Sequence, residues 1–410
     1  MERVDEIVYG IIKQSLFGEP FDMPDTASER IDDETVSKVY SELLLQTVLC
    51  FADKWIMEHR PADERLFAKW SEASKNYQIR ILYVLSAQQS LVGLLKANGI
   101  KHVIIKGSAA AIYYPDPLLR MMGDVDVYVK REDFNRAAKL LEENGYVGTE
   151  AEHHDDDCHS AYHKNSVCIE LHKRLPIVDE GNETLLAMFE KGIDESVDAA
   201  IECLYFPVLP EKLNGMVLLF HINQHLRSGL GLRQILDWMM FVERNIDDEA
   251  WKREYEPAFE ELGMVKFAKT VTEMCKLHLG LGARITWCSD ADHSVCEELL
   301  EYIMKKGNFG IKAGEEGHVT YLFFKKSNPF SFLKRLQDKG KREWSAAKKH
   351  AILRPFAWLY GIKSTIKLMK QNDLSVSDIN ELKNEGVRQR MLISALGLES
   401  DSHIYETDGK

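Results

Sequence analysis

The feature that most constrains the fold is a change of hydrophobic periodicity close to residue 100. Before it, apolar residues recur every three or four positions, as in amphipathic helices, over 36–48 and 81–95. From His102 to Ile105 the sequence becomes a short β-branched run, and further strand patterns follow at Val125–Val129 and Val167–Leu171. A helical pattern separates these two. Strands that alternate with helices over about 80 residues predict an α/β unit with a small sheet.

Helical patterns lie on both sides of this unit. The preceding helix is expected to end at Asn98-Gly99, and from residue 181 onward the sequence is helical again, with breaks near its prolines. We therefore predict an α+β protein that is predominantly helical. Its expected parts are an N-terminal helical region (1–95), an α/β core with a small mixed sheet (96–180) and a C-terminal helical domain (181–410).

Composition excludes several classes of protein. The net charge of −13 argues against a general DNA-coating protein, because such a chain repels phosphate overall. No stretch reaches the ~18 uncharged apolar residues of a membrane-spanning helix, and the acidic start of the chain is unlike a secretory signal. The seven cysteines form no Cys-x-x-Cys pair, which favours reduced thiols and a cytoplasmic location.

The most informative segment is the strand pattern that contains Asp124 and Asp126. In a strand, residues i and i+2 share a face, so these two carboxylates lie side by side while the valines between them face the core. Aspartate is depleted in strands, and neighbouring carboxylates repel each other unless a cation lies between them. The pattern favours a site for Mg²⁺ or Mn²⁺; the alternative is a solvated sheet face.

Glu170 occupies the polar face of the strand pattern Val167–Leu171. If that strand lies beside the first, Glu170 completes a cluster of three carboxylates. Divalent ions held there could bridge a triphosphate and lower the pKa of an attacking hydroxyl.

A turn that suits phosphate precedes the aspartates. Gly107-Ser108 follows a strand and opens a helix, so backbone N–H groups would face an anion there. Lys106 and Arg120 flank the turn and could neutralise phosphate charge. Each feature is weak alone, since a Lys-Gly pair often ends a strand and an arginine is often a surface residue. Together, close to the aspartates, they favour a phosphate-and-metal site.

These segments resemble a known family. The stretch 99–107, the motif Tyr114-Pro115-Asp116-Pro117 with Arg120, and Gly123-Asp124-Val125-Asp126 resemble the uncharacterised bacterial nucleotidyltransferase family of the polymerase-beta-like superfamily. Ile169-Glu170-Leu171-His172 resembles that family's Glu-Leu-His strand.

The resemblance implies that Asp124, Asp126 and Glu170 are metal ligands and that Gly107-Ser108 holds the triphosphate of an NTP, ATP first among them. The reaction expected is transfer of a nucleoside monophosphate to an acceptor hydroxyl, with release of pyrophosphate and with Mg²⁺ or Mn²⁺ as cofactor. In this interpretation Asp126→Asn abolishes transfer and leaves folding intact.

Two pairs in the helical part are further candidates for substrate binding. His221 and His225 share a helix face, but core or hydrogen-bonded histidines are the simpler interpretation. Arg233 and Asp237 have the same spacing and are by default an intrahelical ion pair. In a nucleotidyltransferase, one or both could face the base or the acceptor.

Two other segments are weaker candidates. The run of histidines and acids from His153 to His159 lacks the ligand spacing of a zinc site and is interpreted as a hairpin loop. Residues 325–370 are basic, with interleaved aromatics, and could contact a polyanion, although helices with basic outer faces explain the same pattern.

Three functional hypotheses stay open on the sequence alone. The first is the nucleotidyltransferase; the second is a non-catalytic nucleotide sensor or helical scaffold that keeps the fold; the third is a toxin-like enzyme that differs from the first in its acceptor. Glu170 favours catalysis, because a sensor does not need a third carboxylate. Nothing in the sequence selects the acceptor.

Overall fold

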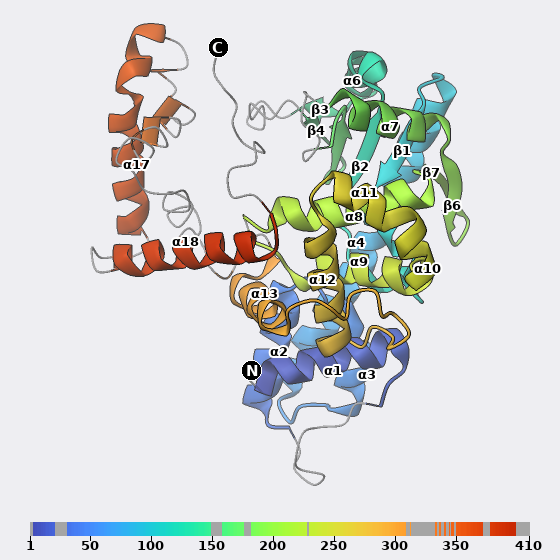
Figure 1. Ribbon diagram of the computed structural model, residues 1–410, viewed down its shortest axis with the longest axis vertical. Helices are drawn as coiled ribbons and strands as arrows, with labels where there is room; N and C mark the ends of the chain where they lie inside the picture. Colours follow the sequence, from blue (N-terminus) through green and yellow to red (C-terminus); the bar gives the residue numbers. More distant parts are fainter. Residues whose placement is uncertain are drawn as a thin grey trace.

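The computed structural model describes residues 3–20, 31–148, 158–175, 182–227, 229–308, 312, 351–371 and 378–398, with scattered positions between 333 and 350 (Figure 1). The fold is α+β and predominantly helical, as predicted, and contains one mixed sheet of seven strands.

The N-terminal region is helical, in agreement with the periodicity. Its elements are α1 (Arg3–Phe17), α2 (Asp33–Leu45), η1 (Leu49–Ala52), α3 (Asp53–Glu58) and α4 (Glu64–Ala97). The long helix α4 ends as expected: Gly99 adopts a φ of +63°, and the amide of Ile100 donates to the carbonyl of Leu95 at 3.0 Å. Because α4 packs against the sheet, it connects the N-terminal helices to the α/β unit.

The sheet brings together segments from residue 102 to residue 208. Its spatial order is β3-β4-β5-β2-β1-β7-β6. The strands are β1 (His102–Ile105), β2 (Asp124–Val129), β3 (Val147–Gly148), β4 (His159–Lys164), β5 (Val167–His172), β6 (Val197–Ile201) and β7 (Leu204–Val208). The helices between them are α5 (Gly107–Ala111), η2 (Pro117–Leu119), α6 (Arg131–Glu143) and α7 (Glu183–Asp194).

Strand β2 lies near the centre of the sheet, antiparallel to β1 and parallel to β5. Its valines are buried, and so are Asp126 and Tyr128 on the opposite face. The alternative of three fully solvated acids is therefore wrong for Asp126, which is covered by protein, whereas Asp124 and Glu170 are partly exposed.

Two sequence expectations were wrong in this region. Residues 159–164, for which no strand was predicted, form β4, which reaches β5 through a tight turn at Asn165-Ser166 with positive φ at both positions. Residues 197–208, interpreted as helical, form the hairpin β6–β7, and β7 pairs with β1 in the same sheet. The division at 95/96 and 180/181 stays a prediction, although the sheet crosses the second boundary.

Helices form the C-terminal part. They are α8 (Glu211–His225), α9 (Leu232–Asn245), α10 (Asp248–Ala250), the π-helical turn η4 (Trp251–Tyr255), α11 (Glu256–Glu261), α12 (Val265–His278), α13 (His293–Lys306), η6 (Ala351–Phe356), α17 (Ala357–Gln371) and α18 (Asp378–Ala395). The central residues of α8 and of α9 are almost all buried.

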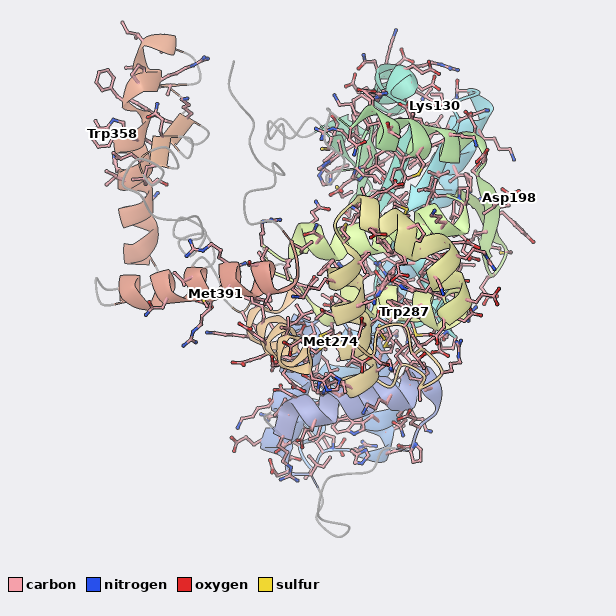
Figure 2. The ribbon with its side chains drawn as sticks, in the orientation of Figure 1. Lys130, Asp198, Met274, Trp287, Trp358 and Met391 are labelled. Carbon is pink, nitrogen blue, oxygen red and sulfur yellow. The ribbon has the colours of Figure 1, made fainter. Side chains whose placement is uncertain are left out.

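The last two helices extend away from the sheet (Figure 1). Helix α18 is anchored to α13 by an ion pair between Glu385 and Lys306 at 2.8 Å. Figure 2 shows Trp358 of α17 far from Lys130 at the end of β2. None of the described helices is both long and apolar enough to span a bilayer.

Candidate active site

The parallel pairing of β2 with β5 brings the predicted carboxylates together. Asp126 lies opposite Glu170 in the register, and Asp124 precedes Asp126 by two residues on the same face. Burial, together with the negative charges of Asp126 and Glu170, raises the pKa of Asp124 to about 6. The three carboxylates are therefore within electrostatic reach of one another, and Asp124 is crowded by like charge.

Asp126 is held by two donors at one oxygen. Its Oδ1 lies 2.8 Å from Lys106 Nζ and 2.9 Å from His172 Nε2. Burial alone would raise the pKa of Asp126, but Lys106 and His172 hold it well below its usual range. Asp126 is thus ionised and fixed in orientation, although it is only 4% exposed.

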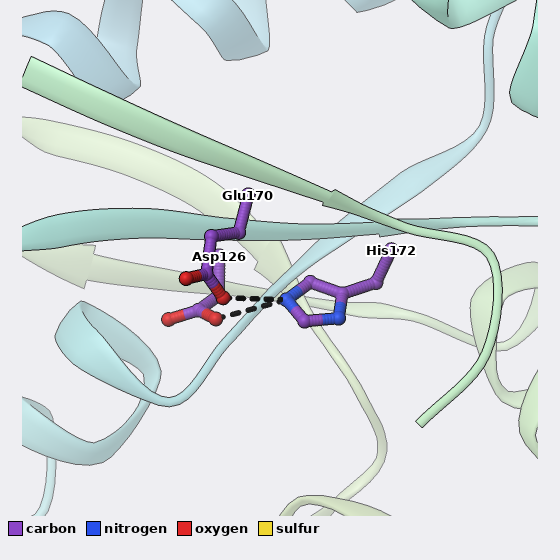
Figure 3. A group of neighbouring side chains, drawn as sticks. All are labelled: Asp126, Glu170 and His172. Carbon is purple, nitrogen blue, oxygen red and sulfur yellow. Dashed lines mark hydrogen bonds and ion pairs between the residues drawn. The ribbon is translucent and has the colours of Figure 1, made fainter. Parts of the chain in front are cut away.

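His172 is a site residue to which the sequence analysis gave no role. Its Nε2 lies 3.3 Å from Glu170 Oε2 as well as near Asp126, so one imidazole nitrogen holds both carboxylates (Figure 3). Both partners are acceptors when ionised, which means that Nε2 carries the hydrogen. The signal was present in the sequence: His172 is two residues after Glu170 and so shares its face of β5.

These side chains could hold a divalent cation. Asp126, Glu170 and His172 are the one group found in the described chain whose possible metal ligands all lie within 4.8 Å of one another. Because His172 Nε2 carries a hydrogen, the two carboxylates of this group would supply the ligand oxygens. The carboxylate oxygens are hard ligands of the kind that Mg²⁺ and Mn²⁺ prefer. A cation would also offset the repulsion that raises the pKa of Asp124. The donor set therefore fits the predicted metal.

The predicted phosphate turn has the expected local structure. Helix α5 begins at Gly107 directly after β1, and Lys106 at its N-cap adopts a φ of +54°. This is a strained backbone conformation for a residue with a Cβ, and such strain is typical of functional sites. Ser108 is 1% exposed, and its hydroxyl donates to Gln88 Oε1 of α4 at 2.6 Å. The turn is thus buried and hydrogen-bonded to α4.

Arg120 has a different environment from the one the sequence suggested. Its Nε and Nη2 donate to the two oxygens of Asp237 at 3.0 and 2.7 Å, and both residues are buried. Tyr114 also donates to Asp237, at 2.9 Å. The expected intrahelical pair of Arg233 with Asp237 was wrong, because Asp237 points from α9 toward Arg120 and Tyr114 of the segment before β2.

Arg233 lies on the site side of α9. Its Nη1 donates to the carbonyl of Met121 at 3.2 Å, three residues before Asp124. The charge of Arg233 lowers the pKa of Asp124 and also acts on His221 and His225. Arg233 therefore lies near the carboxylates of the sheet.

The α8 histidines face the same region, with ring centroids 4.6 Å apart. Burial, and then the charges of Lys106 and Arg233, lower the pKa of His225 to about 3. Burial and His225 lower the pKa of His221 well below its usual range. Both imidazoles are therefore neutral at pH 7.

Arg80 of α4 is a supporting residue that the sequence analysis did not find. Its Nη1 donates to the carbonyl of Ser166 at 2.7 Å and its Nη2 to the carbonyl of Gly123 at 2.6 Å. These carbonyls directly precede β5 and β2, so Arg80 joins the two acidic strands at the ends where they begin. No local pattern could indicate this, because the contacts span 43 and 86 residues.

The run from His153 to His159 reaches the site at its last residue. Residues 153–157 lie outside the described part of the chain, whereas His159 begins β4 and its ring centroid lies 4.9 Å from that of His172. Much of the basic segment 325–370 is outside it too. Its described portion includes α17, whose Tyr360 stacks on Trp344 with ring centroids 5.6 Å apart; α17 itself extends away from the sheet (Figure 1).

A comparison with protein families agrees with this geometry. The model of a family described as an uncharacterised nucleotidyltransferase matches residues 44–280, which is more than half of the chain and spans α4, the sheet, α8 and α9. The chain belongs to this family, as the resemblance predicted. A search of curated proteins finds no match.

Proposed function

We propose that the protein is a metal-dependent nucleotidyltransferase that moves a nucleoside monophosphate from an NTP, ATP first among them, to an acceptor hydroxyl and releases pyrophosphate. The observation that carries the proposal is the pairing of Asp126 with Glu170 on adjacent parallel strands, with Asp124 on the same face, in a chain of a nucleotidyltransferase family. Asp124, Asp126 and Glu170 would hold Mg²⁺ or Mn²⁺.

The roles of the residues follow from their surroundings. When bound, a divalent ion would neutralise phosphate charge and lower the pKa of the acceptor hydroxyl. His172 keeps Asp126 and Glu170 oriented, and Lys106 donates a second hydrogen bond to the same oxygen of Asp126. Of Asp126 and Glu170, Glu170 is the more accessible, with its side chain 26% exposed. The acceptor hydroxyl would therefore bind next to Glu170.

The remaining residues would bind the nucleotide or support the site. Lys106, Gly107 and Ser108 would face the triphosphate at the start of α5. His221 and His225, which are neutral, would contact the nucleotide or acceptor as hydrogen-bonding groups. We assign Arg120 to the support of the site, because its donors are directed to Asp237 and to a backbone carbonyl.

The proposal is tested by incubating the protein with each of the four α-³²P-labelled NTPs, Mg²⁺ and cell extract. We expect one class of molecule, resolved by electrophoresis or chromatography, to acquire label only when Mg²⁺ is present. The same label should not be acquired from a γ-labelled NTP, because pyrophosphate carries the γ-phosphate away. Transfer of the γ-label instead would mean that the protein is a kinase and would overturn the proposal.

Thermal stability distinguishes the enzyme from a nucleotide sensor. At pH 7.5 Asp124 is ionised, since its pKa is about 6, so the metal ligands are charged. An NTP at about 100 times its Kd should then stabilise the protein by about 2.7 kcal/mol, and this gain should require Mg²⁺. An equal rise in Tm with NTP and EDTA would instead favour the sensor.

A further inference from the structure

Two arginines lie beside the acidic strand, and their hydrogen bonds differ. Arg120 is 4% exposed and uses all three of its nitrogens: two for Asp237 and Nη1 for the carbonyl of Met121 at 3.0 Å. A phosphate that bound Arg120 would have to displace a buried carboxylate that already fits the guanidinium bidentately.

Arg233 has donors left over. Its Nη1 shares the carbonyl of Met121 with Arg120, and its Nε is buried without a hydrogen-bond partner among the described residues. A buried donor without an acceptor costs free energy, on the order of 1–3 kcal/mol. Arg233 is nevertheless only partly buried as a residue, and its Nη2 donates to none of the described residues.

The charges around Arg233 also leave it short of a counter-ion. Burial and the neighbouring Arg120 lower the pKa of Arg233, although Asp237 and Asp124 act in the opposite direction. Asp237 is engaged by Arg120, and Asp124 belongs to the carboxylate cluster. The α8 histidines add no positive charge at pH 7, because their pKa values are lowered.

We propose that Arg233, rather than Arg120, binds the polyphosphate of the nucleotide, through the guanidinium N–H groups that no described residue accepts. This inference rests on the proposed function for the identity of the ligand. It follows from a fixed guanidinium with unused donors, beside the carboxylates that would hold the metal of a metal–triphosphate complex. Arg233 is then a specificity residue that distinguishes an NTP from an NMP, because a polyphosphate chain reaches it and a single phosphate does not.

The test measures binding by isothermal titration in the presence of Mg²⁺, with three probes: the NTP that stabilises the wild type most, the corresponding NMP, and inorganic tripolyphosphate. Arg233→Gln should weaken the binding of NTP and of tripolyphosphate by roughly tenfold to a hundredfold, as expected for loss of a charge-assisted hydrogen bond. The affinity for the NMP should change by less than about threefold. Arg233→Lys keeps the charge but loses the planar fork. Its affinity for NTP and tripolyphosphate should therefore lie between those of the wild type and of Arg233→Gln.

Arg253→Gln is the matched control, because Arg253 pairs only with surface carboxylates at the η4 turn and its side chain is 61% exposed. It should bind all three probes as the wild type does. Arg233→Gln should fold, since removing it relieves repulsion of Arg120, and its Tm is measured alongside. If it does not fold, Arg233→Lys decides: tripolyphosphate binding equal to that of the wild type would overturn the inference.

The outcomes separate this inference from the proposed function. Unchanged NTP affinity in Arg233→Gln, or an equal loss for NTP and NMP, would overturn the assignment of Arg233 while nucleotidyl transfer by the wild type still stood. If Arg233→Gln loses tripolyphosphate binding and the wild type transfers no label, the anion site at Arg233 is supported and the transferase is refuted. A wild type that binds neither NTP nor tripolyphosphate would refute both.

Discussion

Replacing Glu170 with Gln should reduce nucleotidyl transfer on the order of 10³-fold, equivalent to about 4 kcal/mol of transition-state stabilisation. The amide keeps the size of the side chain but removes one of the charges that would hold the divalent ions. Binding of Mn²⁺, followed by electron paramagnetic resonance, should weaken at least tenfold. This second measurement does not depend on the acceptor.

Glu170 is a sharper probe than Asp126. Its side chain is partly exposed, and the amide oxygen of Gln can still accept from His172, so the free energy of unfolding should change by less than about 1 kcal/mol. Asp126→Asn would instead leave the ammonium of Lys106 buried without its counter-charge, which costs several kcal/mol. The sequence-based expectation that Asp126→Asn leaves folding intact therefore needs revision.

The control for Glu170→Gln is Glu143→Gln on α6, whose side chain is 60% exposed and pairs only loosely with Lys139 at 3.7 Å. It should transfer label as the wild type does. Transfer by Glu170→Gln within a factor of a few of the wild type would exclude Glu170 as a metal ligand. The interpretation of the three carboxylates as a catalytic cluster would then be lost.

Replacing Arg120 with Gln should destabilise the fold by about 3–5 kcal/mol, because Asp237 would remain buried without its counter-charge. For a protein of this size, Tm should fall by about 4–6 °C. Thermal denaturation at neutral pH measures this. The prediction treats the contact of Arg120 with Asp237 as a support that joins the segment before β2 to α9.

A double-mutant cycle checks that the loss arises from this contact. Because a buried ion pair can be replaced by apolar residues at little cost, Arg120→Met with Asp237→Leu should be more stable than either single variant. Arg253→Gln should change stability by less than about 0.5 kcal/mol. If Arg120→Gln keeps its stability but loses NTP affinity, Arg120 is a nucleotide ligand after all, as its position near the Gly-Ser turn first suggested.

Local patterns were sufficient for those elements whose side chains meet neighbours close in sequence. The helical spacing before residue 97, the end of α4 at Asn98-Gly99 and the strand of Asp124 and Asp126 were all predicted correctly. Strand β4 and the β6–β7 hairpin were not. Polar side chains in β4 and exposed positions in β6 remove the hydrophobic alternation on which strand prediction depends.

The partners of the charged residues could not be predicted in the same way. Arg233 and Asp237 are one helical turn apart, which makes an ion pair the simplest local expectation. Asp237 is instead neutralised by Arg120, 117 residues away, and Arg80 connects strands that local sequence does not relate to it. Interactions across such separations depend on how helices pack on the sheet.

The sequence by itself determined the candidate site residues: two aspartates at strand spacing, a glutamate on a second strand and a Lys-Gly-Ser turn. The carboxylates could be assigned to one face because side-chain direction in a strand alternates with a fixed period. Only the tertiary structure decided that β5 lies parallel to β2, that His172 bridges two carboxylates, and that Asp237 pairs with Arg120 and not with Arg233. Strand neighbours and counter-ions are chosen by burial, since a charge removed from water must find a partner wherever the folded chain provides one.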